Sequence, residues 1–222
     1  MARTGARVLL DALQKRGVEY IFGIPGTLTL PLYDALIDFP IEPVVPRHEQ
    51  GAGFAAVLDQ VVKSIGIIID QSPDHVSLII ENSAGMGQHI CCSFSEIGQV
   101  INAVGSPRIK VCLDTQHLFA AGHNIIEQDG LQRVIAEFDE QIGLNNLVAV
   151  HANDSKTPIA SGVDRHDNIG QGNIGLDGFR VIMSNEAFAD IPFLLEVPGN
   201  DGNGPDKANV DALKELRHEL TL

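Results

Sequence analysis

The sequence has few cysteines, few cations and no long apolar run. The three cysteines, Cys91, Cys92 and Cys112, have no regular spacing. They form neither a disulfide framework nor a thiolate zinc site, and reduced structural thiols are the favoured interpretation. No apolar stretch is long enough to span a bilayer, and the N-terminus shows no secretory signal. We therefore expect no membrane segment and a cytoplasmic location.

Cations are also scarce, because 15 lysines and arginines face 29 aspartates and glutamates, for a formal net charge of −14. This charge opposes non-specific binding to a polyanion. It does not exclude nucleic acid, because acidic residues that hold divalent metals are neutralised by them. The length of 222 residues, 44% of them hydrophobic, allows one large globular domain or two small ones.

Apolar runs alternate with helical periodicity along the chain. Strands are expected at residues 19–23, 41–46, 77–81, 109–114, 147–151 and 191–196. Helices are expected at residues 5–17, 30–38, 51–70 (interrupted at Gly66) and 211–218. Alternating strands and helices predict an α/β fold with a parallel sheet, open or closed into a barrel. About six strands are visible, fewer than the eight of a full barrel, so we predict a barrel-like, partial TIM barrel.

Four of the apolar runs end in an acidic or histidine residue: Glu81, Asp114, His151 and Glu196. Three further residues of these types complete the series: His117 follows Asp114 closely, and Asp164 and His166 lie between the last two runs. The ends of parallel strands meet at one face, and carboxylates with imidazoles in a cleft are the ligands of a zinc or mixed-metal site. The alternatives are buried acid–base pairs for the first set and a loop salt bridge for the second. For the first set metal ligands are favoured, because few arginines are near enough in sequence to pair with four buried ionisable residues.

From about residue 57 to the C-terminus, five sequence blocks resemble endonuclease IV, a metal-dependent apurinic/apyrimidinic endonuclease with a TIM-barrel fold. The blocks are ENSAGMG (81–87), CLDTQHLFAAG (112–122), HANDSK (151–156), DRHDNIG (164–170) and LE (195–196). They keep the order and spacing of that family, which makes the signal much stronger than one short motif. The resemblance implies hydrolysis of the phosphodiester 5′ to an abasic site in DNA, with zinc (Zn²⁺) as cofactor.

The same resemblance assigns roles to individual residues. Glu81 resembles the carboxylate that bridges two metals, and Glu81 and Glu196 are the expected catalytic residues, which hold or orient the attacking hydroxide. The partners of Glu81 at the second metal are expected to be Asp114, His151 and Glu196. The third-metal set is expected to be His117, Asp164 and His166. The first metal of the family also takes two histidines from earlier strands, and this chain lacks the family's sequence there.

Residues 1–56 resemble another family, the start of the pyrimidine-binding domain of thiamine-diphosphate enzymes of the acetolactate synthase group. The matching segments are GA (5–6), GV (17–18), FGIPG (22–26), DAL (34–36) and RHEQGA (47–52). The glutamate that matches Glu49 activates the cofactor in that family. The sequence thus resembles a chimera, by design, recombination or assembly artefact, of a β/α segment (1–56) and an endonuclease IV-like half barrel with the metal site (57–222).

Three functions remain open. The first is an endonuclease IV-type hydrolase acting on abasic DNA, impaired by the incomplete first metal site. The second is a non-catalytic metal-binding half barrel that pairs with another chain, including self-association to complete the barrel. The third is a fragment of a thiamine-diphosphate-dependent carboligase. A further hypothesis is that His48 partly restores the first metal site beside Glu81. We favour the alternative that His48 is inherited from the thiamine family and that its side chain points elsewhere.

Two smaller features also have alternative interpretations. The segment NIGQGNIG (168–175) offers backbone N–H groups that could meet a phosphate, although a tight turn alone explains its glycines equally well. The isolated histidines are expected to be surface or packing residues: His75, His89, His123 and His218.

Overall fold

The computed structural model describes residues 4–22, 30–44, 49–85 and 90–220, in two compact units that divide between Ser64 and Ile65. His48 lies outside the described residues, and the side chain of Glu49 is not described either, so the hypotheses about both stay predictions. In the part of the chain that is described, no helix combines the length and the apolar character needed to cross a membrane.

The first unit contains two short β/α repeats. Its elements are α1 (Gly5–Gln14), β1 (Tyr20–Phe22), α2 (Leu30–Leu36), β2 (Glu42–Val44) and the first part of α3 (Glu49–Gln71). β1 and β2 pair in parallel, with Tyr20 opposite Glu42. Leu10, Leu36 and Ile41 are buried in its small core. The expected elements are all present with slightly different bounds, and α3 continues through Gly66, where an interruption was expected.

The second unit is built on a parallel sheet with the strand order β3-β4-β5-β8. Its strands are β3 (Leu78–Glu81), β4 (Ile109–Asp114), β5 (Leu147–His151) and β8 (Phe193–Leu194). The register places Glu81 beside Cys112, and Asp114 beside His151. The carboxyl ends of neighbouring strands therefore lie side by side, so the residues that end them share one edge of the sheet.

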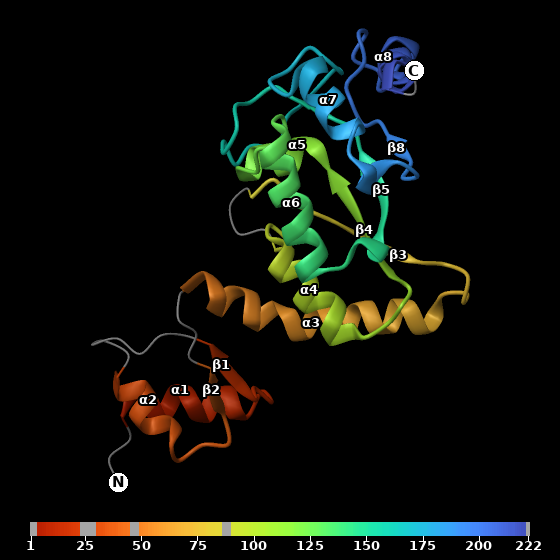
Figure 1. Ribbon diagram of the computed structural model, residues 1–222. Coiled ribbons are helices and arrows are strands. Elements are labelled where there is room, and N and C mark those ends of the chain that lie inside the picture. Colours follow the sequence, from red (N-terminus) through yellow and green to blue (C-terminus); the bar gives the residue numbers. More distant parts are fainter. Residues whose placement is uncertain (1–3, 23–29, 45–48, 86–89, 221–222) are drawn as a thin grey trace. The chain divides into compact units, whose positions relative to one another are not determined.

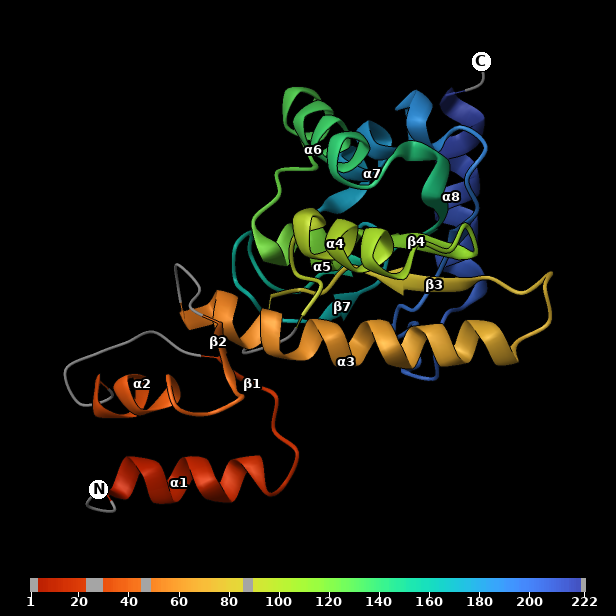
Figure 2. The same ribbon diagram turned by 90° about the horizontal axis from the view of Figure 1, so that it is seen from below.

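Helices follow one another along this sheet. They are α4 (Phe94–Val104), α6 (Gln128–Gln141), α7 (Gly175–Met183) and α8 (Lys207–Leu220), each in contact with the next (Figure 1). In Figure 2, α6 and α7 lie on the same side of β3 and β4. Helix α4 approaches α6 closely at Gly98, where a Cβ atom would lie 2.3 Å from the Gln141 carbonyl oxygen.

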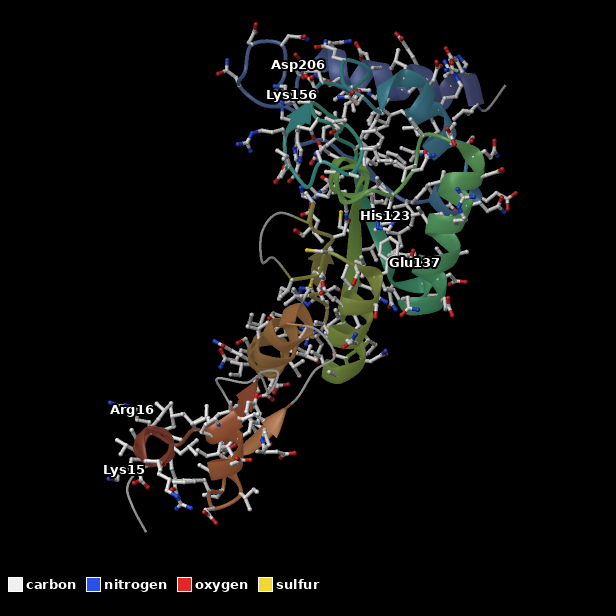
Figure 3. All side chains as sticks on the ribbon, turned by 90° about the vertical axis from the view of Figure 1, so that its left-hand side faces the viewer. Lys15, Arg16, His123, Glu137, Lys156 and Asp206 are labelled. Carbon is white, nitrogen blue, oxygen red and sulfur yellow. The ribbon has the colours of Figure 1, made fainter. Side chains whose placement is uncertain are left out.

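Aromatic side chains fill the space between these helices and the sheet. Phe94 and Phe138 are buried and meet edge to face, with ring centroids 5.4 Å apart. The His123 ring stacks on Phe94 at 5.2 Å, in the region where Glu137 of α6 also lies (Figure 3). Burial lowers the pKa of His123, and the Glu137 charge only partly opposes this effect. The packing role expected for His123 is therefore confirmed.

Short elements connect the larger ones. They are α5 (Thr115–Ala121), two 3₁₀ turns (Leu144–Asn146 and Glu186–Phe188), β6 (Asp154–Ser155) and β7 (His166–Asp167). β6 and β7 form a two-stranded antiparallel ribbon in which Ser155 lies opposite His166. Among the described residues, six strands pair in parallel, two in the first unit and four in the second. The predicted α/β architecture, with parallel strands followed by helices, is therefore present in each unit.

Candidate metal centre

Each candidate ligand is placed by the end of a strand or by the turn that follows it. Glu81 and His151 are the last residues of β3 and β5, and Glu196 follows β8 by two positions. Asp114 ends β4 and also caps α5, since its Oδ1 accepts a hydrogen bond of 2.8 Å from the His117 backbone N–H. This cap turns the chain so that His117 stands one helical turn beyond Asp114.

A first group of side chains gathers at the ends of the four strands. Glu81, Asp114, His151 and Glu196 each offer a ligand atom, and these atoms all lie within 4.8 Å of one another. His151 Nδ1 is 3.1 Å from Glu81 Oε1 and 3.2 Å from Glu196 Oε2. Three carboxylates and one imidazole at these separations match the donor set of a zinc or similar divalent ion.

A second group shares Asp114 with the first. It contains Asp114, His117 and His166, whose ligand atoms also lie within 4.8 Å of one another. The two oxygens of Asp164 lie 3.4 Å from His117 Nε2 and 3.3 Å from His166 Nε2. The structure thus brings together all seven side chains that the sequence singled out. Their role as metal ligands stays a prediction.

Backbone carbonyls orient two of the imidazoles. His117 Nδ1 donates to the Asn82 carbonyl oxygen at 2.8 Å, and His166 Nδ1 lies 3.4 Å from the Glu196 carbonyl oxygen. A carbonyl only accepts, so Nδ1 carries a proton and Nε2 is the nitrogen left to bind a metal. Histidines that bind metals are commonly held in this way by a second hydrogen bond.

Several atoms that face the centre have no hydrogen bond. They are Glu81 Oε1, His117 Nε2, His151 Nδ1 and His166 Nε2, all buried. Leaving one buried polar atom unsatisfied costs about 1–3 kcal/mol. Each ligand group contains two such atoms, which are costly for the protein alone, and a cation bound in each group would satisfy them. The residues present therefore fit a metal centre.

The electrostatics of the site also suit a cation. Burial lowers the pKa of His117, but the carboxylates of Glu81, Asp114 and Asp164 outweigh this effect and raise it to about 9. Burial raises the pKa of Asp114. Both shifts mean that the site attracts positive charge, which a metal ion supplies in place of protons.

Cys112 lies beside the site but is held as a thiol. Burial and the nearby Glu81 charge raise the pKa of Cys112 to about 12. A thiolate ligand at this position is therefore disfavoured, as the cysteine spacing had indicated. Cys91, Cys92 and Cys112 are all free thiols in the structure.

A family model described as a xylose isomerase-like TIM barrel matches residues 6–218. The chain belongs to this family. The match includes most of the segment 1–56. The resemblance of that segment to thiamine-diphosphate enzymes stays a prediction.

Two similar curated proteins are named as probable endonucleases. Probable endonuclease 4 of Trichlorobacter lovleyi is 39% identical over 163 residues, which cover 72% of this chain and 58% of the relative. Probable endonuclease 4 of Phocaeicola vulgatus is 43% identical over 142 residues, covering 64% of this chain and 50% of the relative. The sequence resemblance to endonuclease IV is thereby confirmed, and the chain spans between 50% and 58% of the length of these two relatives.

A solved structure has a fold similar to that of this chain. Endonuclease IV from Thermus thermophilus matches with a TM-score of 0.59 and 21% identity, covering 99% of this chain and 96% of that chain. At this identity the likeness shows the fold alone, and it agrees with the barrel-type arrangement of strands predicted from the sequence.

Two buried asparagines of this TIM-barrel protein were missed by the sequence reasoning. Asn82 Oδ1 accepts the Asp114 backbone N–H at 2.7 Å. Asn153 Nδ2 donates to Asp114 Oδ2 at 2.6 Å, while its Oδ1 accepts the Glu196 backbone N–H at 2.9 Å. Both amides therefore hold the candidate ligands in place. The available signal was their position, since Asn82 directly follows Glu81 and Asn153 follows His151 by two residues.

The glycine-rich segment 168–175 does not offer free N–H groups to a phosphate. The backbone N–H groups of Gly170, Gly172, Ile174 and Gly175 all donate to the carboxylate of Asp154. Of the two interpretations of these glycines, the tight turn is correct, because an internal carboxylate fills the place that an external anion would need.

Proposed function

We propose that this chain is an endonuclease IV-type, zinc-dependent hydrolase that cleaves DNA on the 5′ side of abasic sites. One observation carries the proposal. Seven acidic and histidine side chains, from the ends of neighbouring parallel strands, from α5 and from the segment that opens β7, lie together, and four of their buried inward atoms have no hydrogen bond. The blocks of sequence that hold these residues are those that resemble endonuclease IV.

The two groups of side chains would hold separate ions that share Asp114. The first would be held by Glu81, Asp114, His151 and Glu196, and the second by Asp114, His117, Asp164 and His166. Bound divalent ions supply Lewis acidity toward a phosphoryl oxygen and make water acidic enough to react near neutral pH. They also offset the carboxylate charge that would otherwise repel DNA from a chain of net charge −14.

Two carboxylates are placed to orient the attacking water. Glu81 Oε1 and Glu196 Oε2 both lie close to His151 Nδ1, so they face a common point. The Glu196 side chain is 48% exposed and the Glu81 side chain 34% exposed, whereas Asp114 is completely buried. Glu81 and Glu196 are thus the residues of the first group that substrate can reach, and they would accept the proton of the attacking water.

Cleavage of a defined duplex tests this function. A duplex with one abasic site, labelled on the damaged strand, is incubated with zinc-loaded protein, with chelated protein, and beside an intact duplex of the same sequence. We expect metal-dependent cleavage 5′ to the abasic site and none of the intact duplex. Absence of cleavage by fully metal-loaded protein, or equal cleavage of both duplexes, would contradict the proposal.

A second candidate is a non-catalytic half barrel that pairs with another copy of the chain. Strands of a closed barrel each have two neighbours, but β3 and β8 lie at the edges of the four-stranded sheet in the described part of the chain. Ile79 of β3 and Leu194 of β8 are about half exposed. A metal-loaded dimer in sedimentation equilibrium, without cleavage of abasic DNA, would favour this candidate over the first.

A further inference from the structure

The β6–β7 ribbon carries one arm of the candidate metal centre. His166 opens β7 opposite Ser155, and Asp164 precedes it by two residues. The segment 168–175 follows β7 and folds back over β6. The positions of Asp164 and His166 therefore depend on how firmly this ribbon and turn are held, and we call residues 164–175 the arm.

Asp154 is a buried acidic residue around which this arm folds. It is completely buried and makes no ion pair with a lysine, arginine or histidine among the described residues. Its Oδ1 accepts the N–H groups of Ser155 and Ile174 at 2.7 and 2.9 Å. Its Oδ2 accepts those of Gly170 and Gly172 at 2.9 and 3.0 Å. A buried carboxylate is costly unless it is hydrogen-bonded, and here backbone N–H groups replace a cation.

The start of α7 and the turn glycines make this arrangement possible. Gly175, the first residue of α7, also donates to both oxygens of Asp154, at 3.3 and 3.2 Å. The carboxylate thus lies at the positive end of the helix dipole. Gly172 has no room for a side chain, because a Cβ atom would lie 2.5 Å from Asp154 Oδ1. The turn is therefore built around Asp154.

The preceding residue, Asn153, performs a different task. It is also completely buried, but its side chain bonds to the Asp114 carboxylate and to the backbone of Glu196. Asp114 belongs to both candidate ligand groups, whereas the arm contributes His166 to only one of them.

We propose that Asn153 and Asp154 are positioning residues with separate targets: Asn153 fixes the shared ligand Asp114, and Asp154 fixes the arm with Asp164 and His166. This inference rests on the proposed metal centre. Asp154→Asn keeps the shape of the side chain but replaces one acceptor oxygen with an NH₂ group. The NH₂ group cannot accept hydrogen bonds from the backbone N–H groups that face it. The arm would therefore shift, while the ligands at the strand ends would keep their positions.

Zinc titration of the metal-free protein by calorimetry tests the division. The wild-type chain should show two classes of site, and His166→Ala identifies the class that depends on the arm. Asp154→Asn should weaken that class about 10- to 100-fold, the usual effect of losing a residue that supports a ligand, and leave the other class within about 2-fold. Asn153→Ala should weaken both classes. The double variant of Asp154→Asn with His166→Ala should bind no more weakly in the arm class than His166→Ala alone.

Each other result overturns the inference. Equal weakening of both classes by Asp154→Asn would show a general structural role, and unchanged affinities would show no positioning role. In either case two zinc classes in the wild type would leave the proposed metal centre standing, whereas no zinc uptake by the wild type would overturn both proposals.

If Asp154→Asn does not fold, Asn173→Ala takes its place, since it removes only a 2.9 Å hydrogen bond between the turn and the Ser155 carbonyl. Weaker zinc binding in the arm class alone supports the inference, and unchanged binding overturns it.

Discussion

Glu81→Gln is expected to abolish metal-dependent cleavage of abasic DNA, while Glu49→Gln leaves it unchanged. Glu81 Oε1 lies 3.1 Å from His151 Nδ1 and 3.2 Å from His117 Nδ1, between the two ligand groups. The substitution removes the charge of a proposed metal ligand, so the loss should exceed the roughly 10- to 100-fold caused by changes in supporting residues. Glu49 resembles a contact to thiamine diphosphate and is not one of the seven residues of the proposed centre.

Initial rates of strand cleavage at saturating zinc measure this difference. Circular dichroism and thermal melting confirm that both variants are folded. An equal loss of cleavage in the two variants would be inconsistent with the assigned role of Glu81. Carboligation stimulated by thiamine diphosphate would instead support the resemblance of residues 1–56 and count against the proposed function.

Phe138→Ala is expected to produce a large loss of stability. Phe138 is completely buried between α6 and the sheet and meets Phe94 edge to face. Truncating a buried phenylalanine to alanine costs about 3–5 kcal/mol in free energy of unfolding, through lost apolar burial and the cavity left behind. For a chain of this size the melting temperature should fall by roughly 10 °C.

Urea unfolding of Phe138→Ala beside Glu140→Ala measures the effect. Glu140 is exposed on the same helix, so its substitution should change the free energy of unfolding by less than about 0.5 kcal/mol. If both variants lose equally little stability, the helices do not pack on the sheet as described.

The strands were predictable from the sequence where they consist of uninterrupted apolar runs. β4 and β5 have the bounds expected from their apolar runs, because a parallel strand covered on both faces is apolar throughout. The run 191–196 contains only a two-residue strand, Phe193–Leu194. β8 is an edge strand in the described part of the sheet, and Pro192 has no N–H for a ladder.

The candidate ligands were predictable for a similar reason, since each ends a recognisable strand or lies in a block that resembles endonuclease IV. The residues that support them were not. Asn82 and Asn153 act on Asp114 across 32 and 39 positions of sequence. No periodicity shows such pairs, because they depend on the register between strands. The role of Asp154 could not be predicted either, because its hydrogen-bond partners are backbone groups of a distant turn.

The central claim is that the converging side chains form a metal centre, and metal content tests it most directly. Protein purified without chelator is analysed for zinc and other transition metals, then stripped and titrated with zinc. The two ligand groups predict more than one equivalent of metal per chain. Less than one equivalent, with no uptake on titration, would contradict the account.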